Sequence, residues 1–327
     1  MPALGLTFEE CVRSTPGLEG SLLSAASARD VATVLGALPD VFRCGGIECR
    51  LLQSERVDVV VCADRRRAKG LLAVASDSYC GRLLRNWLTG QGPLQNMSAV
   101  WLEFDRPSSG TDATLPTPWA TAFAFFRVAE AAARLPPPRN LATLFEALGP
   151  EFTAGPEAVA EALRRALPRG ASLLHLAALQ HRGEPEVRAH AAVDPDSWDE
   201  YLSSALAGQH EKQRLLRYVV GAFRWPLAVQ LAATSNGFRP TSVELSLAHD
   251  EAGQHEWSAI FSRLVETSLA SPTKSHAVQA WPSLLQFRPS NAPANIRVER
   301  PFHVTLRFDG EVEAKAYLYF YPRYVAD

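Results

Sequence analysis

The last stretch of the chain carries its densest group of side chains that could do chemistry. Alternate positions between residues 300 and 324 offer an imidazole, a hydroxyl, a guanidinium, an ammonium and three phenols, on His303, Thr305, Arg307, Lys315, Tyr317, Tyr319 and Tyr321. Alternate residues of a β-strand share one face, so a hairpin turned at Asp309-Gly310 would present all of them together. Tyrosine rings with polar tips suit the wall of a wet reaction cavity. A solvent-facing sheet with cross-strand aromatic pairs is the alternative.

Hydrophobic periodicity predicts that two helices precede this pair of strands, and that the same order occurs five times along the chain. The predicted strand pairs are 46–53 with 57–62, 99–105 with 120–127, 171–181 with 187–193, 226–234 with 241–249, and 302–308 with 314–321. The predicted helices run from 7 and from 27, and over 66–76, 77–89, 141–148, 156–167, 196–207, 211–223, 256–269 and 272–281. A loop rich in Pro and Asn is predicted before the last pair.

Short turns between paired strands require antiparallel pairing, because parallel neighbours need a crossover connection. Ten strands of this kind can close into a barrel, which removes the open edges of the sheet. We therefore predict an α+β fold in which five helix-helix-strand-strand units form a ten-stranded antiparallel barrel surrounded by helices, as a single domain over residues 1–327. The alternative is a two-domain α+β protein divided near Pro136-Pro137-Pro138.

If the apolar face of each strand packs under the helices, the other face lines the lumen. This rule places ionisable, amide and aromatic side chains from all five strand pairs inside the barrel, and a packed core could not hold so many charges. The set is Glu48, Arg50, Asp58, Trp101, Glu103, Asp105, His175, Arg188, His190, Gln230, Thr234, Glu244, Ser246, His303, Thr305, Arg307, Lys315, Tyr317, Tyr319 and Tyr321. The sequence thus predicts a solvent-filled chamber.

Composition excludes several classes of function. The net charge of -2 gives no reason to expect a nucleic acid or an anionic membrane as partner. No apolar run approaches the roughly 18 residues of a membrane helix. The five cysteines form no CxxC pair, which favours reduced thiols in a cytoplasmic protein over disulfides or zinc. The signatures of phosphate loops, dinucleotide folds, serine hydrolases and zinc proteases are also missing.

This architecture resembles that of the aromatic prenyltransferase superfamily, the ABBA or PT barrel, whose reaction takes place inside ten antiparallel strands. Two motifs carry the resemblance at residue level. Lys315-Ala316-Tyr317 matches the Lys-x-Tyr pattern that the indole prenyltransferase branch carries on barrel strands. Glu48 stands where that branch places a proton acceptor on its first barrel strand. The lumen has fewer cations than that family uses, and the Asp-rich motifs of classical isoprenyl synthases are missing.

The resemblance implies transfer of a dimethylallyl or geranyl group from its diphosphate to an aromatic or peptide acceptor. The diphosphate would be bound by the lumen cations Arg50, Arg188, Arg307 and Lys315. Tyr317, Tyr319, Tyr321 and Trp101 would shield the allylic cation. Glu48 or Glu103 would accept the proton. His175, His190, Gln230, Glu244, His303 and Thr305 would complete the lumen wall.

Other interpretations stay open at this point. The same barrel could run a different chemistry, such as a cyclisation or a peptide modification, or could bind a hydrophobic ligand or peptide without catalysis. The three lumen histidines could form a metal site, although we predict no protein-bound metal. Mg²⁺ is an optional cofactor, because metal dependence varies within the family.

Overall fold

A computed structural model of the protein describes residues 8–13, 15, 18–38, 43–52, 57–65, 68–73, 79–90, 92–104, 120–124, 135–148, 155–180, 185–221, 223–234, 237–246, 251–281, 284–287 and 295–325. Within these ranges, no helix combines the length and the apolar character that crossing a membrane requires.

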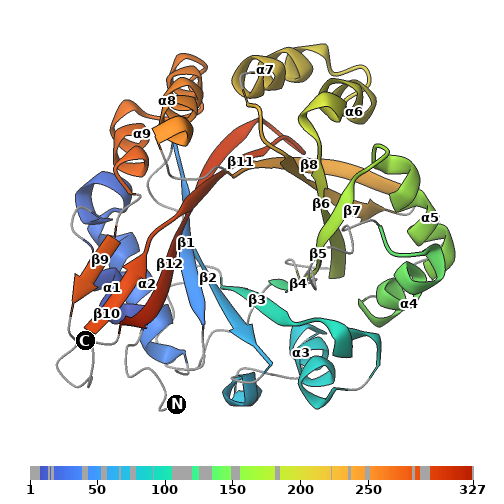
Figure 1. The fold of residues 1–327 in the computed structure, drawn as a ribbon, viewed down its shortest axis with the longest axis horizontal. Coiled ribbons are helices and arrows are strands. Elements are labelled where there is room, and N and C mark those ends of the chain that lie inside the picture. The colour runs from blue at the N-terminus through green and yellow to red at the C-terminus, as the bar shows by residue number, and fades with distance from the viewer. Residues whose placement is uncertain are drawn as a thin grey trace.

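The strands of the barrel form a closed antiparallel ring (Figure 1). Each strand pairs with the next, and β12 pairs with both β11 and β1, which closes the ring. The ring strands are β1 (Cys44–Arg50), β2 (Val57–Asp64), β3 (Ala99–Phe104), β4 (Ala120–Ala124), β5 (Ser172–Gln180), β6 (Pro185–Val193), β7 (Leu227–Thr234), β8 (Gly237–Leu245), β11 (Phe302–Arg307) and β12 (Glu313–Val325). The predicted ten-stranded α+β barrel is therefore confirmed.

The helices surround this ring on the outside (Figure 1). They are α1 (Phe8–Arg13), α2 (Ala25–Ala37), α3 (Tyr79–Thr89), α4 (Pro138–Leu148), α5 (Pro156–Ala166), α6 (Trp198–Ala205), α7 (His210–Val220), α8 (Glu251–Glu266) and α9 (Pro272–Gln279). Shorter turns lie at η1 (Leu18–Leu22), η2 (Ala68–Ala73), η3 (Pro93–Asn96) and η4 (Pro195–Ser197). Among the described residues of the second unit, α3 is thus preceded by the 3-10 turn η2, where two helices were predicted.

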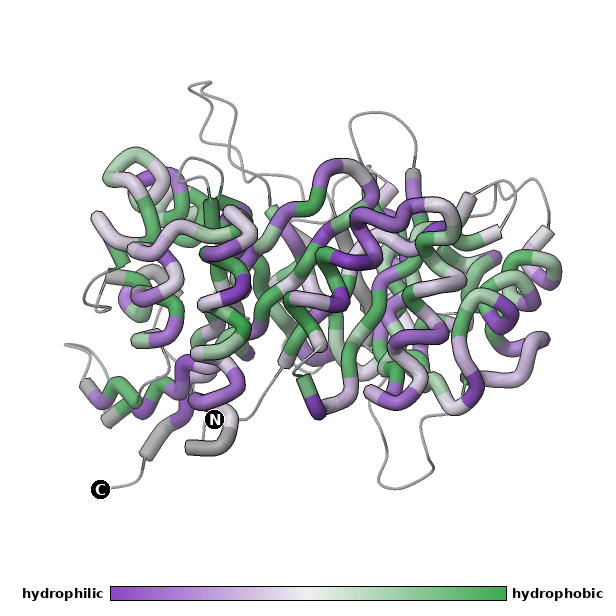
Figure 2. Tube along the Cα trace, turned by 90° about the horizontal axis from the view of Figure 1, so that it is seen from above, coloured by the Kyte–Doolittle hydropathy of each residue, from purple (hydrophilic) through white to green (hydrophobic). Residues whose placement is uncertain are grey.

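The core lies between the helices and the outer face of the strands. In β12, Ala316, Leu318 and Phe320 are fully buried, and the Phe320 ring lies 5.2 Å from that of Trp281, which follows α9. The intervening residues of β12 face the lumen, as the two-residue period of a strand requires. Hydrophobic and hydrophilic positions are intermixed along the chain in Figure 2. The two-residue period leaves the inner face of the ring free to carry polar groups.

Helix ends also position the barrel strands. The Ser271 hydroxyl accepts a hydrogen bond from the Lys274 backbone N–H at 3.2 Å and so begins α9 with a side-chain cap. The Lys274 ammonium then donates to the Arg50 carbonyl oxygen at 2.6 Å, where β1 ends. This bond ties α9 to the strand end that carries Arg50.

The structure differs from the prediction before the last strand pair. Part of the predicted loop forms an additional hairpin, β9 (Leu284–Phe287) with β10 (Asn295–Glu299). β10 pairs with the far half of β12, which is long enough to serve both the ring and this extension. Strands from the two sides of Pro136-Pro137-Pro138 also pair with each other, as β4 with β5, so the sheet is continuous across that point.

Candidate active site

A cavity of about 400 Å³ occupies the lumen. All the residues to which a role was assigned line the cavity, namely Glu48, Arg50, Trp101, Glu103, His175, Arg188, His190, Gln230, Glu244, His303, Thr305, Arg307, Lys315, Tyr317, Tyr319 and Tyr321. Asp58 and Ser246 line it as well, and Asp105 lies outside the described residues. Thr234, at the end of β7, is exposed and does not line the cavity, so its predicted place in the lumen was wrong. The location of the lining residues is thus established, and the chemical role of each stays a prediction.

Both Lys315 and Tyr317 of the Lys-x-Tyr motif hydrogen-bond Glu48 at the centre of the lumen. Glu48 and Tyr317 are partners across β1 and β12. The Lys315 ammonium donates to Glu48 Oε1 at 2.6 Å, and the Tyr317 hydroxyl also hydrogen-bonds this carboxylate. Burial alone would raise the pKa of Glu48, but Lys315 and Tyr317 together hold it below its ordinary value. Glu48 is therefore an ionised carboxylate inside the barrel.

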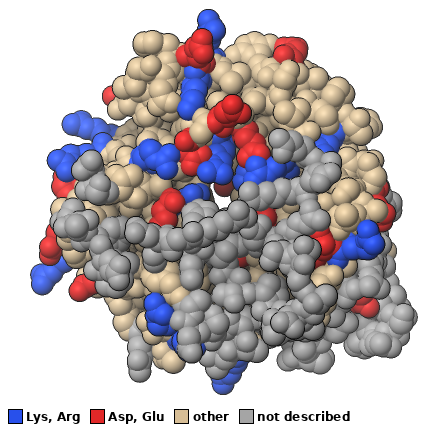
Figure 3. Space-filling model, turned by 180° about the vertical axis from the view of Figure 1, so that it is seen from behind, with Lys and Arg blue, Asp and Glu red and all other residues tan. Residues whose placement is uncertain are grey.

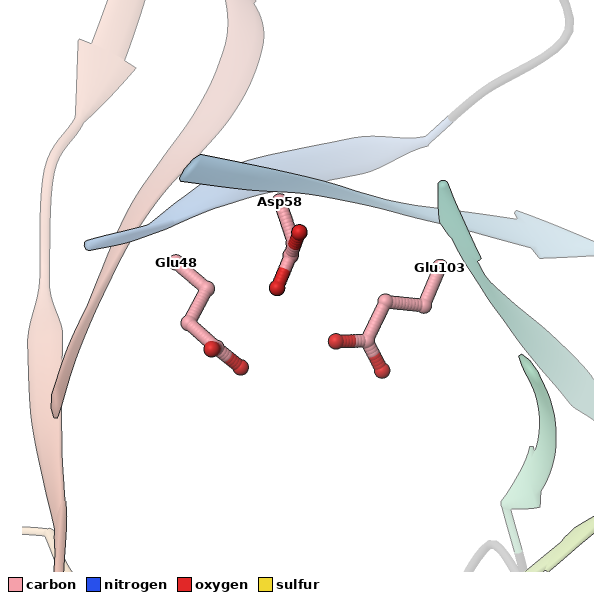
Figure 4. Close-up of side chains that lie close together, drawn as sticks. All are labelled: Glu48, Asp58 and Glu103. Carbon is pink, nitrogen blue, oxygen red and sulfur yellow. The ribbon is translucent and has the colours of Figure 1, made fainter. Parts of the chain in front are cut away.

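Glu48 belongs to a carboxylate cluster with Asp58 and Glu103, which come from β1, β2 and β3 and point toward one another (Figure 4). One oxygen of each lies within 4.8 Å of the other two. Burial, followed by the charges of Glu48 and Asp58, raises the pKa of Glu103 well above its ordinary value. The cluster thus combines an ionised carboxylate with a protonated carboxylic acid, the arrangement that acid and base catalysis uses.

These carboxylates are also the one group among the described residues with the spacing of metal ligands. Carboxylate oxygens suit Mg²⁺, but Lys315 already neutralises Glu48, so a metal ion would have to compete with an ammonium. His175 and His190 have rings 5.7 Å apart and do not join such a group. The alternative of a histidine metal site therefore gains no support from the described residues.

Four cations and their carboxylate partners form what we call the charged end of the lumen. This end extends inward to the Lys315–Glu48 pair, which lies beside Tyr317 at the centre. Arg50 contacts Glu313, Arg188 contacts Glu186 at 2.7 Å, Arg307 contacts Asp309, and Lys315 contacts Glu48. The Arg307–Asp309 pair is bidentate, with Nε to Oδ1 at 2.6 Å and Nη2 to Oδ2 at 3.0 Å. Figure 3 shows blue and red side chains gathered around the central opening on this side of the molecule. The pairs hold each guanidinium in a defined orientation.

The sequence prediction missed Glu186, Asp309 and Glu313 as partners. Two of them were visible in principle, because Glu186 and Arg188, and likewise Arg307 and Asp309, are two residues apart and so share a strand face. Glu313 reaches Arg50 across the β1–β12 closure. That contact depends on the register, which the sequence pattern alone did not give.

A hydrogen-bond network determines the protonation state of His190, one of the three lumen histidines. The Gln230 side-chain oxygen accepts from Arg188 Nη1 at 3.1 Å, and a guanidinium can only donate. The Gln230 amide nitrogen therefore faces His190 Nε2, at 2.7 Å, and donates to it. His190 must then be neutral with its proton on Nδ1, in agreement with burial, which lowers its pKa well below the ordinary value. Burial likewise lowers the pKa values of His175 and His303.

Aromatic rings line the opposite end of the lumen, which we call the aromatic end: Trp101, Tyr319 and Tyr321, with Cys44 and Cys62 packed against Trp101 and Tyr321. The ring of Tyr319 is central: its centroid lies 5.7 Å from Trp101 and 5.9 Å from Tyr321, and 6.4 Å from the stacked ring of Tyr317. Burial raises the pKa values of these tyrosines, which keeps their hydroxyls neutral. This end of the cavity is thus lined by neutral rings.

A glycine makes room for this stack. Gly46 is the Cα partner of Tyr319, and a Cβ at that position would lie 2.8 Å from the Tyr319 ring and 2.7 Å from the Leu318 carbonyl oxygen. Any larger residue would push the ring away from β1. The position of Tyr319 over the strand therefore requires glycine, for reasons of space.

Of three comparisons with known proteins, the one with solved structures finds matches. No protein-family model matches the chain. A search of curated proteins finds no match either. Among solved structures, the fold is similar to the crystal structure of AnaPT from Neosartorya fischeri, an ABBA-type aromatic prenyltransferase, over 85% of this chain and 77% of that chain, with 12% sequence identity and a TM-score of 0.45. The closed antiparallel ring establishes the barrel independently.

Proposed function

We propose that this barrel transfers an allylic group, dimethylallyl or geranyl, from its diphosphate to an aromatic or peptide acceptor. The observation that carries the proposal is the polarity of one cavity: oriented cations line one end, neutral aromatic rings line the other, and an ionised carboxylate lies between them. These are the three environments that a diphosphate, an allylic cation and a departing proton need.

The diphosphate would lie at the charged end. Arg307 uses Nε and Nη2 for Asp309, and its Nη1 makes no hydrogen bond to any described residue. Arg50 uses Nη1 for Glu313, which leaves its other nitrogens without a partner in the same part of the chain. Guanidinium edges held in this way match phosphate oxygens. The pairs with carboxylates would then orient the donors that the ligand uses.

The transfer itself breaks the allylic carbon–oxygen bond, and the electron pair leaves with the diphosphate. The carbocation would form beside Tyr317, Tyr319 and Trp101, whose ring faces stabilise positive charge and exclude water. An acceptor carbon then supplies the electrons of the new bond and loses its proton. We assign that proton to Glu48, because Glu48 is ionised while Glu103 is protonated. Although Glu48 is a weak base, a protonated aromatic intermediate is a much stronger acid than any carboxylic acid.

One observation favours a second candidate. Each of the four lumen cations already has a carboxylate partner, so the positive charge of the cavity is balanced. A balanced cavity suits a neutral aromatic ligand that is bound without catalysis or that reacts by acid–base chemistry between Glu103 and Glu48. This candidate keeps the barrel and changes the ligand.

Calorimetric titration with dimethylallyl and geranyl thiolodiphosphate, which are unreactive analogues, separates the two candidates. We expect micromolar binding to the wild type, about -8 kcal/mol, and a loss of tenfold or more in Arg307→Gln. Arg323→Gln is the matched control, since Arg323 also pairs with a glutamate, Glu299, but is largely exposed and outside the cavity. No binding to the wild type, with or without Mg²⁺, would refute the transferase and leave the neutral-ligand barrel.

A further inference from the structure

Two of the five cysteines face each other at the aromatic end. Cys44 begins β1, Cys62 lies in β2, and the two are Cα partners in the antiparallel register. Both share the lumen side of their strands with Glu48 and Asp58, which follow the same two-residue period. Both are buried as free thiols in a small cluster with Ala99, against Trp101 and Tyr321. The two thiols also hydrogen-bond each other.

The register places this pair within reach of a covalent bond. Directly opposite residues of antiparallel strands have Cα atoms about 4.5 or 5.5 Å apart, depending on the type of pair. A disulfide accepts Cα separations of about 4.4 to 6.8 Å. Either type of pair therefore allows the bond without a shift of the strands.

The other three cysteines have no such arrangement. Cys49 lies on the outer, helix-facing side of β1, between Ile47 and Leu51. Cys11 and Cys80 lie in α1 and α3, and the Cys80 thiol contacts the Ala178 carbonyl oxygen at 3.7 Å. Of the five cysteines, only Cys44 and Cys62 are therefore placed to form a disulfide with each other, and both lie on the inner side of the ring.

We propose that Cys44 and Cys62 form a reversible oxidation site, in which a peroxide converts the two thiols to a disulfide that joins β1 to β2. One thiolate attacks the peroxide oxygen, the O–O bond breaks, and a sulfenic acid forms with release of water. The second thiolate attacks that sulfur, forms the S–S bond and releases a second water. In total, two thiols lose two electrons and two protons, and the peroxide is reduced. This inference does not depend on the prenyl transfer proposed above.

Two consequences follow from the surroundings of the pair. The hydrogen bond to Cys44, together with burial, raises the pKa of the Cys62 thiol, so oxidation should be slow near neutral pH and faster in alkaline solution. The bond would also fix the β1–β2 wall beneath Tyr321 and Trp101. Oxidation is thus expected to change the aromatic end and to leave the charged end unaltered.

Mass spectrometry of the folded wild-type protein tests the site. The protein is treated with hydrogen peroxide, remaining thiols are alkylated, and the chain is digested without reduction. We expect a loss of two hydrogen atoms, a cross-linked peptide that contains Cys44 and Cys62, and full recovery of both thiols with dithiothreitol. Alkylation of both residues after oxidation, or a cross-link between other cysteines, would overturn the proposal.

Variants separate the pair from general thiol oxidation. Cys49→Ser should form the same cross-link as the wild type, because Cys49 faces away from the lumen. Cys62→Ser should stop at a sulfenic acid on Cys44, which dimedone traps. Equal dimedone labelling of Cys44 in Cys62→Ser and in the wild type would show that no disulfide forms in the wild type and would also contradict the proposal.

Discussion

The two ends of the lumen hold their side chains by different forces. At the charged end, each cation is held by a carboxylate. Where such a pair is buried, removal of one partner leaves an unpaired buried charge and destabilises the fold. At the aromatic end, Trp101 and Tyr321 are fixed by contact with Tyr319 and by the buried cysteines. About 20 Å of strand separates Lys315 from Tyr321 along β12, at roughly 3.3 Å per residue. The same strand, β12, therefore contributes Lys315, which is held by an ion pair, and Tyr321, which is held by packing.

Because the Lys315–Glu48 pair is buried, we expect removal of the Lys315 charge to have the largest effect on stability. Lys315→Ala would leave Glu48, which is 2% exposed, ionised and without its ammonium. We expect a loss of about 3–5 kcal/mol in the free energy of unfolding, the usual cost of breaking a buried pair. Urea denaturation measures it.

The double variant Glu48→Gln with Lys315→Ala is the control, because it removes both charges, and it should recover most of the loss. The pKa of Glu48 is held low in the folded protein, so its contribution is present at neutral pH and disappears as the pH falls through that folded pKa. A loss below about 1 kcal/mol for Lys315→Ala would mean that Glu48 is solvated rather than buried.

At the aromatic end, loss of one ring should have the next largest effect. Tyr319 contacts the rings of Trp101, His303, Tyr317 and Tyr321. Aromatic pairs contribute about 0.5–1.5 kcal/mol each beyond burial, so we expect Tyr319→Leu to lose about 2–3 kcal/mol. Tyr319→Phe keeps the ring and should lose less than about 1 kcal/mol.

Tyr218→Leu serves as the surface control for this prediction. Tyr218 is 45% exposed and contacts Arg263 and Glu266 outside the barrel. Its substitution should cost less than that of Tyr319 in thermal or urea unfolding. Equal losses at the two positions would show that the stacked rings of the lumen add nothing beyond an ordinary surface tyrosine.

For Glu48, Trp101 and Tyr317, among others, the sequence predicted the strand face that enters the lumen, because side chains alternate with a period of two. It could not predict which partner each side chain meets. Arg50 contacts Glu313 and Lys315 contacts Glu48 across the closure of the ring, so both contacts follow from the register between β1 and β12. Irregularities at Leu173/His175 and at Gln230/Leu231 shift the register of two further pairs.

Two other features were beyond the sequence pattern for physical reasons. The β9–β10 hairpin forms because β12 extends past the ring, and only the folded length of β12 reveals the free strand edge. The protonation of Glu103 depends on Glu48 and Asp58, which are 55 and 45 positions away in the chain. The two-residue period of the strands places all three carboxyl groups in the lumen. Which of them is ionised depends on the distances between them, which the sequence does not give.

A smaller effect is expected from Glu103, and it should depend on pH. The folded protein raises the pKa of this carboxyl, so its native form is stabilised at low pH, and this stabilisation is lost as the pH rises through the folded pKa. Glu103→Gln cannot ionise and should be more stable than the wild type in alkaline solution, by about 1 kcal/mol as for typical substitutions. The difference should shrink as the pH is lowered.

Thermal unfolding across a pH series checks this behaviour, with Glu311→Gln as the exposed control on the β11–β12 turn. A parallel response of the two variants to pH would contradict a protonated Glu103. At the aromatic end we expect no similar pH dependence of stability. Burial raises the pKa values of Tyr319 and Tyr321, and the hydrogen bond to Cys44 together with burial raises that of the Cys62 thiol. The pH dependence thus separates the centre of the lumen from the aromatic end.

The smallest effect on stability, and the sharpest one on ligand binding, is expected from Asp309→Asn. Arg307 is partly exposed, so its pair with Asp309 should contribute less than about 1 kcal/mol. The bidentate contact nevertheless sets the direction of the guanidinium that lines the cavity. Loss of that orientation should weaken binding of geranyl thiolodiphosphate several-fold in calorimetry while the protein stays folded.

Asp199→Asn is the matched control, because Asp199 pairs with Arg217 at 3.0 Å on the outer helices. Both substitutions remove a carboxylate from an arginine, and only one of those arginines lines the lumen. If both variants bind the analogue like the wild type, Asp309 does not orient Arg307 for a ligand. If only Asp309→Asn binds less tightly, the carboxylate partners at the charged end position the cations for an anion instead of neutralising them, and the balanced charge of the cavity no longer argues for a neutral ligand.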